Sequence, residues 1–233
     1  MKKLLIALLL GVTTMAQAEY RMSLFELTVK PENQQAIEAI GKHNLGTSIQ
    51  TEAGTLAMFH TVKKDEPSKN VILEVYQDDQ AYQVHSQAEH FKQFVEVAKT
   101  AVIERKAEAL NSQFLAEKRP LADFENGNYL INLATVRVKS AQNDAFKAIV
   151  VDEMKQAMAK ESGVLLMYAA TLKEQPNEWR FFEIYADQAA YAQHRQTPHF
   201  QAYLKGTNGM IESKGVVELQ GKTLVTKGVF QSK

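Results

Sequence analysis

The chain has 233 residues, with 27 Lys and Arg against 27 Asp and Glu, and 45% of its residues are hydrophobic. These values are ordinary for a globular protein and exclude disordered, collagen-like and coiled-coil chains. The balanced charge provides no basic stripe, so nucleic acid is not an expected partner. The chain contains no cysteine, which excludes disulfides, zinc–thiolate sites, iron–sulfur clusters and cysteine nucleophiles.

Residues 1–18 have the pattern of a secretory signal peptide. Lys2 and Lys3 form a short positive region, an apolar run follows from Leu4 to Val12, and Ala16-Gln17-Ala18 is a small-x-small cleavage site. The alternatives are a membrane anchor or a buried N-terminal helix, but the apolar run is too short to span a bilayer. We therefore expect cleavage after Ala18, export across the inner membrane without stable membrane anchoring and, in a Gram-negative bacterium, a periplasmic protein.

The rest of the chain contains the same pattern twice, at an offset of 183 − 74 = 109 residues. The segment from Val71 to His85 resembles that from Arg180 to His194, and the register holds without a gap over most of each copy. The period is too long for a solenoid unit, so each copy is expected to be a complete small domain. The predicted domains are 19–118 and 129–233, joined by a linker at 119–128 that is rich in turn residues.

Each copy has the same predicted order of elements. The first copy is expected to contain a strand at 22–29, a helix after Pro31, strands at 55–62 and 71–76, a helix capped by Asp78 that breaks after His85 and restarts at Glu89, and a strand at about 110–117. The second is expected to contain a strand at 129–138, a helix with Phe146, Ile149, Val150 and Met154 on one face, strands at 164–172 and 179–185, a helix capped by Asp187 that breaks after His194 and restarts at Pro198, and a strand at about 216–226.

This order, strand–helix–strand–strand–helix–strand, is that of a ferredoxin-like α+β unit. The helices cover one face of its antiparallel sheet, and the strands are apolar enough that the other face also needs cover. Two units can cover each other sheet to sheet. The sequence therefore predicts two tandem ferredoxin-like units that form an intrachain dimeric α/β-barrel, a pseudo-dimer within one chain.

The block Glu74-Val-Tyr-Gln-Asp … His85-Ser-Gln-Ala-Glu-His90-Phe resembles the antibiotic biosynthesis monooxygenase family. Its second copy, Glu183-Ile-Tyr-Ala-Asp … His194-Arg-Gln-Thr-Pro-His199-Phe, is similar to the quinol monooxygenase and autoinducer-processing branches. The turns Glu52-x-Gly54 and Glu161-x-Gly163 also match the family. The resemblance implies a barrel with a pocket between each sheet and its helices, and oxygenation of a small quinol or polyphenol by O₂ with no metal, flavin or other cofactor.

The resemblance and the residue chemistry together suggest the site residues. The catalytic candidates, which would transfer protons or anchor the substrate, are His85, His194, Glu74 and Glu183. The candidates for substrate binding are Tyr76, Tyr185, Tyr82, Tyr191, His90, His199 and Asn44. Each has an alternative structural role: a packed histidine at the helix break, a paired carboxylate, or a core aromatic. The five-residue spacing within each His pair is not the i, i+4 spacing of a helical zinc site, so no metal is predicted.

The sequence also departs from the family pattern. Tyr76 and Tyr185 stand where many members have Trp, and the haem-degrading branch has a His where this chain has Val95 and Leu204. This argues against haem degradation. The two copies have diverged, and the fuller motif of the second favours it as the active one. The alternative to an enzyme is a non-catalytic periplasmic protein that binds an aromatic or haem-like ligand. A homodimer of pseudo-dimers is a further expected assembly.

Overall fold

The computed structural model describes residues 20–123 and 128–231, and the predicted signal peptide lies outside this part of the chain. The first unit consists, in chain order, of β1 (Arg21–Val29), the 3-10 turn η1 (Pro31–Asn33), α1 (Gln34–Thr51), β2 (Thr55–Lys63), β3 (Lys69–Tyr76), α2 (Asp79–Gln87), α3 (Glu89–Ala101) and β4 (Val102–Glu117). After the short β5 (Ala122–Asp123), the second unit consists of β6 (Leu130–Val138), η2 (Ser140–Gln142), α4 (Asn143–Lys160), β7 (Val164–Leu172), β8 (Glu178–Tyr185), α5 (Gln188–His194), α6 (Pro198–Gly206) and β9 (Ile211–Thr226). None of the helices in these ranges is long and apolar enough to cross a membrane.

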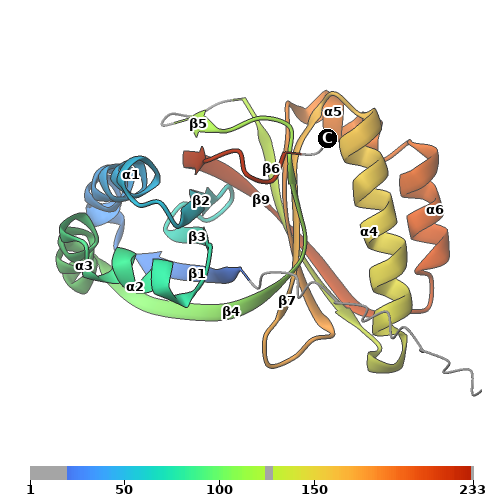
Figure 1. Cartoon of the computed structure of the whole chain (residues 1–233), viewed down its shortest axis with the longest axis horizontal. Coiled ribbons are helices and arrows are strands. Elements are labelled where there is room, and N and C mark those ends of the chain that lie inside the picture. The colour runs from blue at the N-terminus through green and yellow to red at the C-terminus, as the bar shows by residue number, and fades with distance from the viewer. Residues whose placement is uncertain (1–19, 124–127, 232–233) are drawn as a thin grey trace, which may run out of the picture.

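The strands form one antiparallel sheet that closes on itself. Their order is β2-β3-β1-β4-β7-β8-β6-β9, β5 pairs with the end of β9, and β9 also pairs with β2. Helices α1, α2 and α3 cover the outside of the first unit, and α4, α5 and α6 cover the second (Figure 1). The predicted pair of ferredoxin-like units in an intrachain barrel is therefore confirmed.

Two long strands join the units. The first half of β4 pairs with β1 of its own unit, and its second half pairs with β7 of the other unit. In the same way, the first half of β9 pairs with β6 of its own unit, and its second half pairs with β2 of the first unit. Both strands have 16 residues and begin several residues earlier than the sequence analysis predicted. The early halves were missed because they are exposed on both faces and show no apolar alternation, as in Glu104, Arg105 and Lys106 of β4.

The alternation of side chains along each strand separates the barrel interior from the helix-covered outer face. On β8, Phe182 and Ile184 belong to the barrel core, which joins residues of both units. Phe181 and Tyr185 belong instead to the layer beneath α4, α5 and α6. Glu183 lies on the same face of β8 as Phe181 and Tyr185 and therefore faces the helices. Glu74 on β3 does the same. The predicted caps also form: the Asp78 and Asp187 side chains accept from the backbone N–H groups of Ala81 and Ala190.

Trp179 and its counterpart Asn70 show how the two copies have diverged in packing. The Trp179 ring stacks on Phe181 with centroids 5.6 Å apart, and its Nε1–H donates to Asn143 at 2.8 Å. In the first unit, Asn70 Oδ1 lies 2.7 Å from Nε2 of the buried His60. That ring needs a glycine at position 41, because a Cβ there would lie 2.8 Å from His60 Nδ1. His60 is thus accounted for by packing.

An ion pair across the β4–β7 side of the barrel links the units. Arg180 on β8 donates two hydrogen bonds of 2.8 Å to Glu108 on β4, and both side chains are about one-tenth exposed. Burial would raise the pKa of Glu108, but hydrogen bonds from Arg180 and Lys106 outweigh it and lower the pKa.

We expect Arg180→Met to lower the free energy of unfolding by about 2 kcal/mol, since it leaves a nearly buried carboxylate without its bidentate partner. Because the pKa of Glu108 is lowered in the folded state, this loss is present at neutral pH and disappears as the pH falls through that lowered pKa. Urea unfolding at pH 7 and at pH 3 measures it. The control is Arg137→Met, which breaks the more exposed pair with Glu178 and should cost less than about 0.5 kcal/mol. Equal losses for the two variants would contradict this prediction.

Candidate functional site

Each unit contains a buried cluster of one glutamate and two histidines at the base of its helices. In the second unit, Glu161 at the end of α4 has its Oε1 3.0 Å from His194 Nδ1 and 2.6 Å from His199 Nε2. A carboxylate only accepts, so both imidazoles donate to it. The helix break between α5 and α6 allows both rings to reach the same oxygen.

The first unit has the same cluster with two additional hydroxyls. Glu52 Oε1 lies 3.2 Å from His85 Nδ1 and 2.8 Å from His90 Nε2. Ser48 Oγ lies within 3.2 Å of the same two ring nitrogens, and Thr55 donates to Glu52 Oε2 at 2.5 Å. Burial alone would raise the pKa of Glu52, but the hydrogen bonds from His85 and Thr55 lower it, so this glutamate stays ionised.

Sequence reasoning placed Glu52 and Glu161 in turns that match the family and missed their role in these clusters. The signal was present, since the Glu-x-Gly turn is repeated at the same offset as the histidines. His90 and His199, predicted to bind substrate, instead hold these carboxylates. His199 is 8% exposed and lines a shallow groove between α4 and α6 rather than the main pocket.

The cavity of the second unit lies between its sheet and its helices and has a volume of about 470 Å³. Four of the predicted site residues belong to its polar lining: Glu183, Tyr185, Tyr191 and His194. Its polar lining also includes Asn132 and Glu153, which sequence reasoning did not select. Arg195, Tyr203 and Lys214 also line it, beside apolar residues such as Val150 and Phe181. The size is typical of a small-molecule site.

Glu153 is buried on α4, at 5% exposed, and its Oε1 has no hydrogen-bond partner among the described residues. It lies 3.8 Å from His194 Nε2. Burial, with repulsion from Glu183 and Glu161, raises the pKa of Glu153 to about 8. Its position could have been found from the sequence, because it lies on the same helical face as Phe146, Val150 and Met154.

Glu183 is the second carboxyl group of this cavity. Burial raises its pKa to about 7, although the Tyr185 hydroxyl donates to Glu183 Oε2 at 2.9 Å and opposes the rise. Tyr185 thus positions Glu183. Asn132, nearby on β6, is buried, and its interaction with the Tyr191 hydroxyl opposes the rise that burial causes in the pKa of Tyr191. The cavity therefore offers two carboxyl groups that hold protons near neutral pH, one amide, one imidazole and the cationic side chains of Arg195 and Lys214.

The cavity of the first unit, about 430 Å³, occupies the equivalent place but has a different lining. Glu74 and Tyr82 line it as predicted, whereas His85, Tyr76 and Asn44 do not. Burial raises the pKa of Glu74 against the attraction of His85 and the hydrogen bond from Tyr76. Most of the wall is apolar, formed by Phe25, Leu27, Ile72, Phe91, Phe94, Val95, Ala98 and Val102. Asn44 is the counterpart of Glu153, so the first cavity lacks the second carboxyl group.

Among residues 20–123 and 128–231, two groups of side chains have the donor types and the proximity to hold a metal ion. In each of these groups, Glu52 with His85 and His90 and Glu153 with His194 and His199, the donor atoms lie within 4.8 Å of one another. Nitrogen and carboxylate ligands are those that Zn²⁺ accepts. The hydrogen bonds to Glu52 and Glu161 satisfy one nitrogen of each imidazole without an ion.

Comparisons with known proteins identify the family. The model of the antibiotic biosynthesis monooxygenases matches twice, at residues 22–97 and 129–206. The chain belongs to this family. A proposed monooxygenase from Lactobacillus acidophilus is 30% identical, with a TM-score of 0.85 over 90% of this chain and 97% of that one. No curated protein matches the chain.

Two further solved structures share the fold of this family member. A proposed monooxygenase from Fusobacterium nucleatum has a TM-score of 0.84 at 23% identity, over 94% of this chain and 99% of that one. An anthrone oxidase-like protein has a TM-score of 0.60 at 9% identity, over 93% of this chain and 96% of that one. The two-unit barrel within one chain is therefore found in other proteins.

The raised pKa values predict how stability changes with pH. Between about pH 4.5 and pH 8 the folded protein keeps protons on Glu153 and Glu183 that the unfolded chain releases, so stability falls as the pH rises. We expect Glu153→Gln to remove part of this fall and to raise the free energy of unfolding at pH 8 by on the order of 3 kcal/mol, with little effect at pH 4.5. Urea unfolding across this range measures it. Glu174→Gln, at an exposed position between β7 and β8, is the control and should leave the slope unchanged; the same slope in wild type and Glu153→Gln would refute the assignment.

Proposed function

We propose that the second unit is a cofactor-independent monooxygenase that acts on a small quinol or polyphenol. The observation that supports this most is the pair of buried carboxyl groups, Glu153 and Glu183, in one cavity with pKa values of about 8 and about 7. A base with a pKa near the working pH is suited to taking a phenolic proton. The family membership supports the reaction class.

The proposed reaction needs only O₂ as co-substrate. The ionised carboxyl group removes a proton from the quinol hydroxyl, and the resulting phenolate transfers one electron to O₂. The semiquinone and superoxide combine into a ring hydroperoxide, which loses water to give the hydroxyquinone. A simple hydroquinone balances as C₆H₆O₂ + O₂ → C₆H₄O₃ + H₂O, so the substrate itself supplies all the electrons.

Each side chain of the second cavity has a proposed role in this reaction. Glu153 and Glu183 are the proton acceptors, and the Asn132 amide anchors a substrate oxygen through Nδ2–H. His194 exchanges a proton with Glu153 through Nε2, while Glu161 fixes the ring through Nδ1. Tyr191, on the cavity wall, packs against the aromatic ring. Burial lowers the pKa of His194, although Glu161 opposes this, and a neutral imidazole can accept a proton.

We expect purified protein to consume O₂ with a panel of reduced quinones faster than their autoxidation. Glu153→Gln, Glu183→Gln and His194→Ala should each slow turnover by at least about 100-fold, which is typical for loss of an acid/base group. His85→Ala, the equivalent change in the first unit, is the matched control and should stay within about twofold. The rate should rise between pH 6 and pH 8, as the carboxyl pair loses its proton.

Other outcomes of the same assay would count against the proposal. Oxygen uptake no faster than autoxidation across the panel would overturn it. A rate that dialysis against EDTA abolishes and that Zn²⁺ restores would replace it with a metal-dependent reaction at Glu153, His194 and His199.

The first cavity supports a second candidate function, ligand binding without turnover. Its wall is mostly apolar, Asn44 stands at the position that corresponds to the second carboxyl group, and neither Asn44 nor His85 lines it. An aromatic ligand would meet a single carboxyl group there, that of Glu74, without the second carboxyl group and the imidazole of the other cavity. Saturable binding of an aromatic compound that survives Glu183→Gln but not a Phe94→Trp block of the first cavity would support this function.

We propose further that the protein acts in the periplasm, since residues 1–18 have the three parts of a signal peptide. Expression in a Gram-negative host should give a periplasmic protein whose N-terminal sequence begins Glu19-Tyr20-Arg21. A cytoplasmic protein that retains Lys2 and Lys3 would contradict this proposal.

A further inference from the structure

The two units meet at two junctions, where β4 and β9 cross from one unit to the other. The offset of 109 residues relates the positions of the two junctions, but their side chains differ. Each junction lies beside a β-bulge in one of the two long strands, at Gln113 in β4 and at its counterpart Lys222 in β9. Each is flanked by the first helix of the unit onto which that strand crosses, α4 or α1. Any difference between the two junctions therefore reflects side chains and not backbone topology.

The junction at Lys222 is closed by two ion pairs between units. Lys222 Nζ lies 3.1 Å from Glu38 of α1, and Lys64 Nζ lies 2.5 Å from Glu218 of β9. In each pair the lysine and the glutamate belong to different units, so the pairs hold the two units together.

The junction at Gln113 lacks both pairs. Lys147 stands at the position that corresponds to Glu38, and Gln113 at the position that corresponds to Lys222. Lys173 corresponds to Lys64, but the position that corresponds to Glu218 is Ala109. Neither lysine side chain has an acidic partner among residues 20–123 and 128–231. A cavity of about 570 Å³ lies at this junction.

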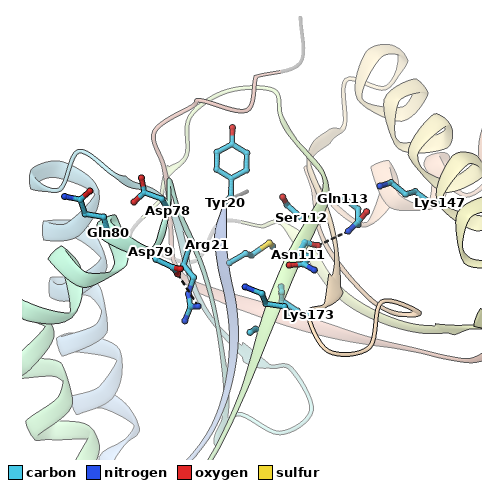
Figure 2. Close-up of a pocket in the computed structure, with 13 residues that line it drawn as sticks. Tyr20, Arg21, Asp78, Asp79, Gln80, Asn111, Ser112, Gln113, Lys147 and Lys173 are labelled. Carbon is cyan, nitrogen blue, oxygen red and sulfur yellow. Dashed lines mark hydrogen bonds and ion pairs between the residues drawn. The ribbon is translucent and has the colours of Figure 1, made fainter. Parts of the chain in front are cut away.

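The acidic side chains of this cavity are already engaged. Asp79 pairs with Arg21 at 3.4 Å, and Asp78 caps α2 through the N–H of Ala81. Arg21, whose counterpart is Leu130, also has a buried Nε without an acceptor in the described chain. Figure 2 shows Lys147 extending toward Gln113, with Asp78, Asp79 and Gln80 on the opposite wall and Asn111 and Ser112 between the two sides. The unsatisfied groups of this site are therefore cationic or neutral donors.

We propose that this junction cavity binds a small organic anion with two or more carboxylates. Lys147 and Lys173, which come from different elements, each pair with one carboxylate, and Arg21 Nε and the Asn111 amide donate to the remaining oxygens. The volume suits an organic molecule better than a monatomic or inorganic ion. The ligand supplies the negative charge that Glu38 and Glu218 supply at the other junction.

Isothermal titration with citrate at pH 7 and low salt tests this site. We expect saturable binding at one site per chain, weakened about tenfold by Lys147→Ala and by Lys173→Ala, because each removes one charge-assisted contact. The matched control is Lys64→Ala, which removes the equivalent lysine of the closed junction and should change citrate affinity less than twofold. The variants alter exposed residues, and their melting temperatures verify folding.

A double variant tests whether the missing ion pair at this junction is the reason that it binds an anion. Gln113→Lys combined with Lys147→Glu copies the Lys222–Glu38 pair into the open junction and should abolish citrate binding. The proposal is overturned if citrate shows no saturable binding, if Lys64→Ala weakens it as much as Lys147→Ala, or if the double variant binds as tightly as wild type. Oxygen uptake with quinols should be the same in all these variants, so this proposal and the proposed enzyme activity can fail separately.

Discussion

Closure of the barrel by the exchanged halves of β4 and β9 is the constraint on which both cavities depend. The inner faces of the two four-stranded sheets are rich in large apolar residues, such as Phe59 and Phe182, whose rings lie 4.9 Å apart across the two units. Burying them against each other removes these faces from water. The sheet then has only its outer face left for the helices. Because Glu74 and Glu183 alternate with core residues, they can point only toward the helices, where the cavities lie.

Duplication has kept the scaffold and changed the chemistry. The Glu–His–His clusters of the two units nearly superpose in sequence position and in hydrogen bonds, which indicates that they hold the broken helix against the sheet. The cavity walls have diverged instead. Glu153, Asn132 and Tyr203 of the second unit correspond to Asn44, Ser23 and Phe94 of the first. A cluster common to both units is best explained by architecture, and a group found in only one cavity is the better candidate for catalysis.

Much of the fold follows from the sequence, because a repeat in constant register carries the strand and helix pattern twice and the apolar strands need cover on both faces. The helix breaks after His85 and His194 and the caps at Asp78 and Asp187 were predicted from local chemistry and are confirmed. The length of β4 and β9 was underestimated, since pairing with a distant strand leaves no local pattern in a charged segment. Tyr76 and Tyr185 were both predicted to bind substrate, but only Tyr185 lines a cavity, and both hydroxyls donate to the neighbouring glutamate of their strand. Glu153 was overlooked because a glutamate in a helix is usually solvent-exposed, although its spacing from Phe146, Val150 and Met154 places it on the buried face of α4.

The proton held by the carboxyl pair of the second cavity can be observed directly by NMR titration of protein carrying ¹³C-labelled glutamate side chains. We expect two carboxyl resonances to titrate near pH 7 and pH 8, as the raised pKa values of Glu183 and Glu153 require. In Glu153→Gln the resonance near pH 8 should be missing, and the other should still titrate near pH 7, because Glu153 is protonated when Glu183 ionises. If every glutamate of the wild-type protein titrates below pH 5.5, the second cavity holds no proton at neutral pH and the account is wrong.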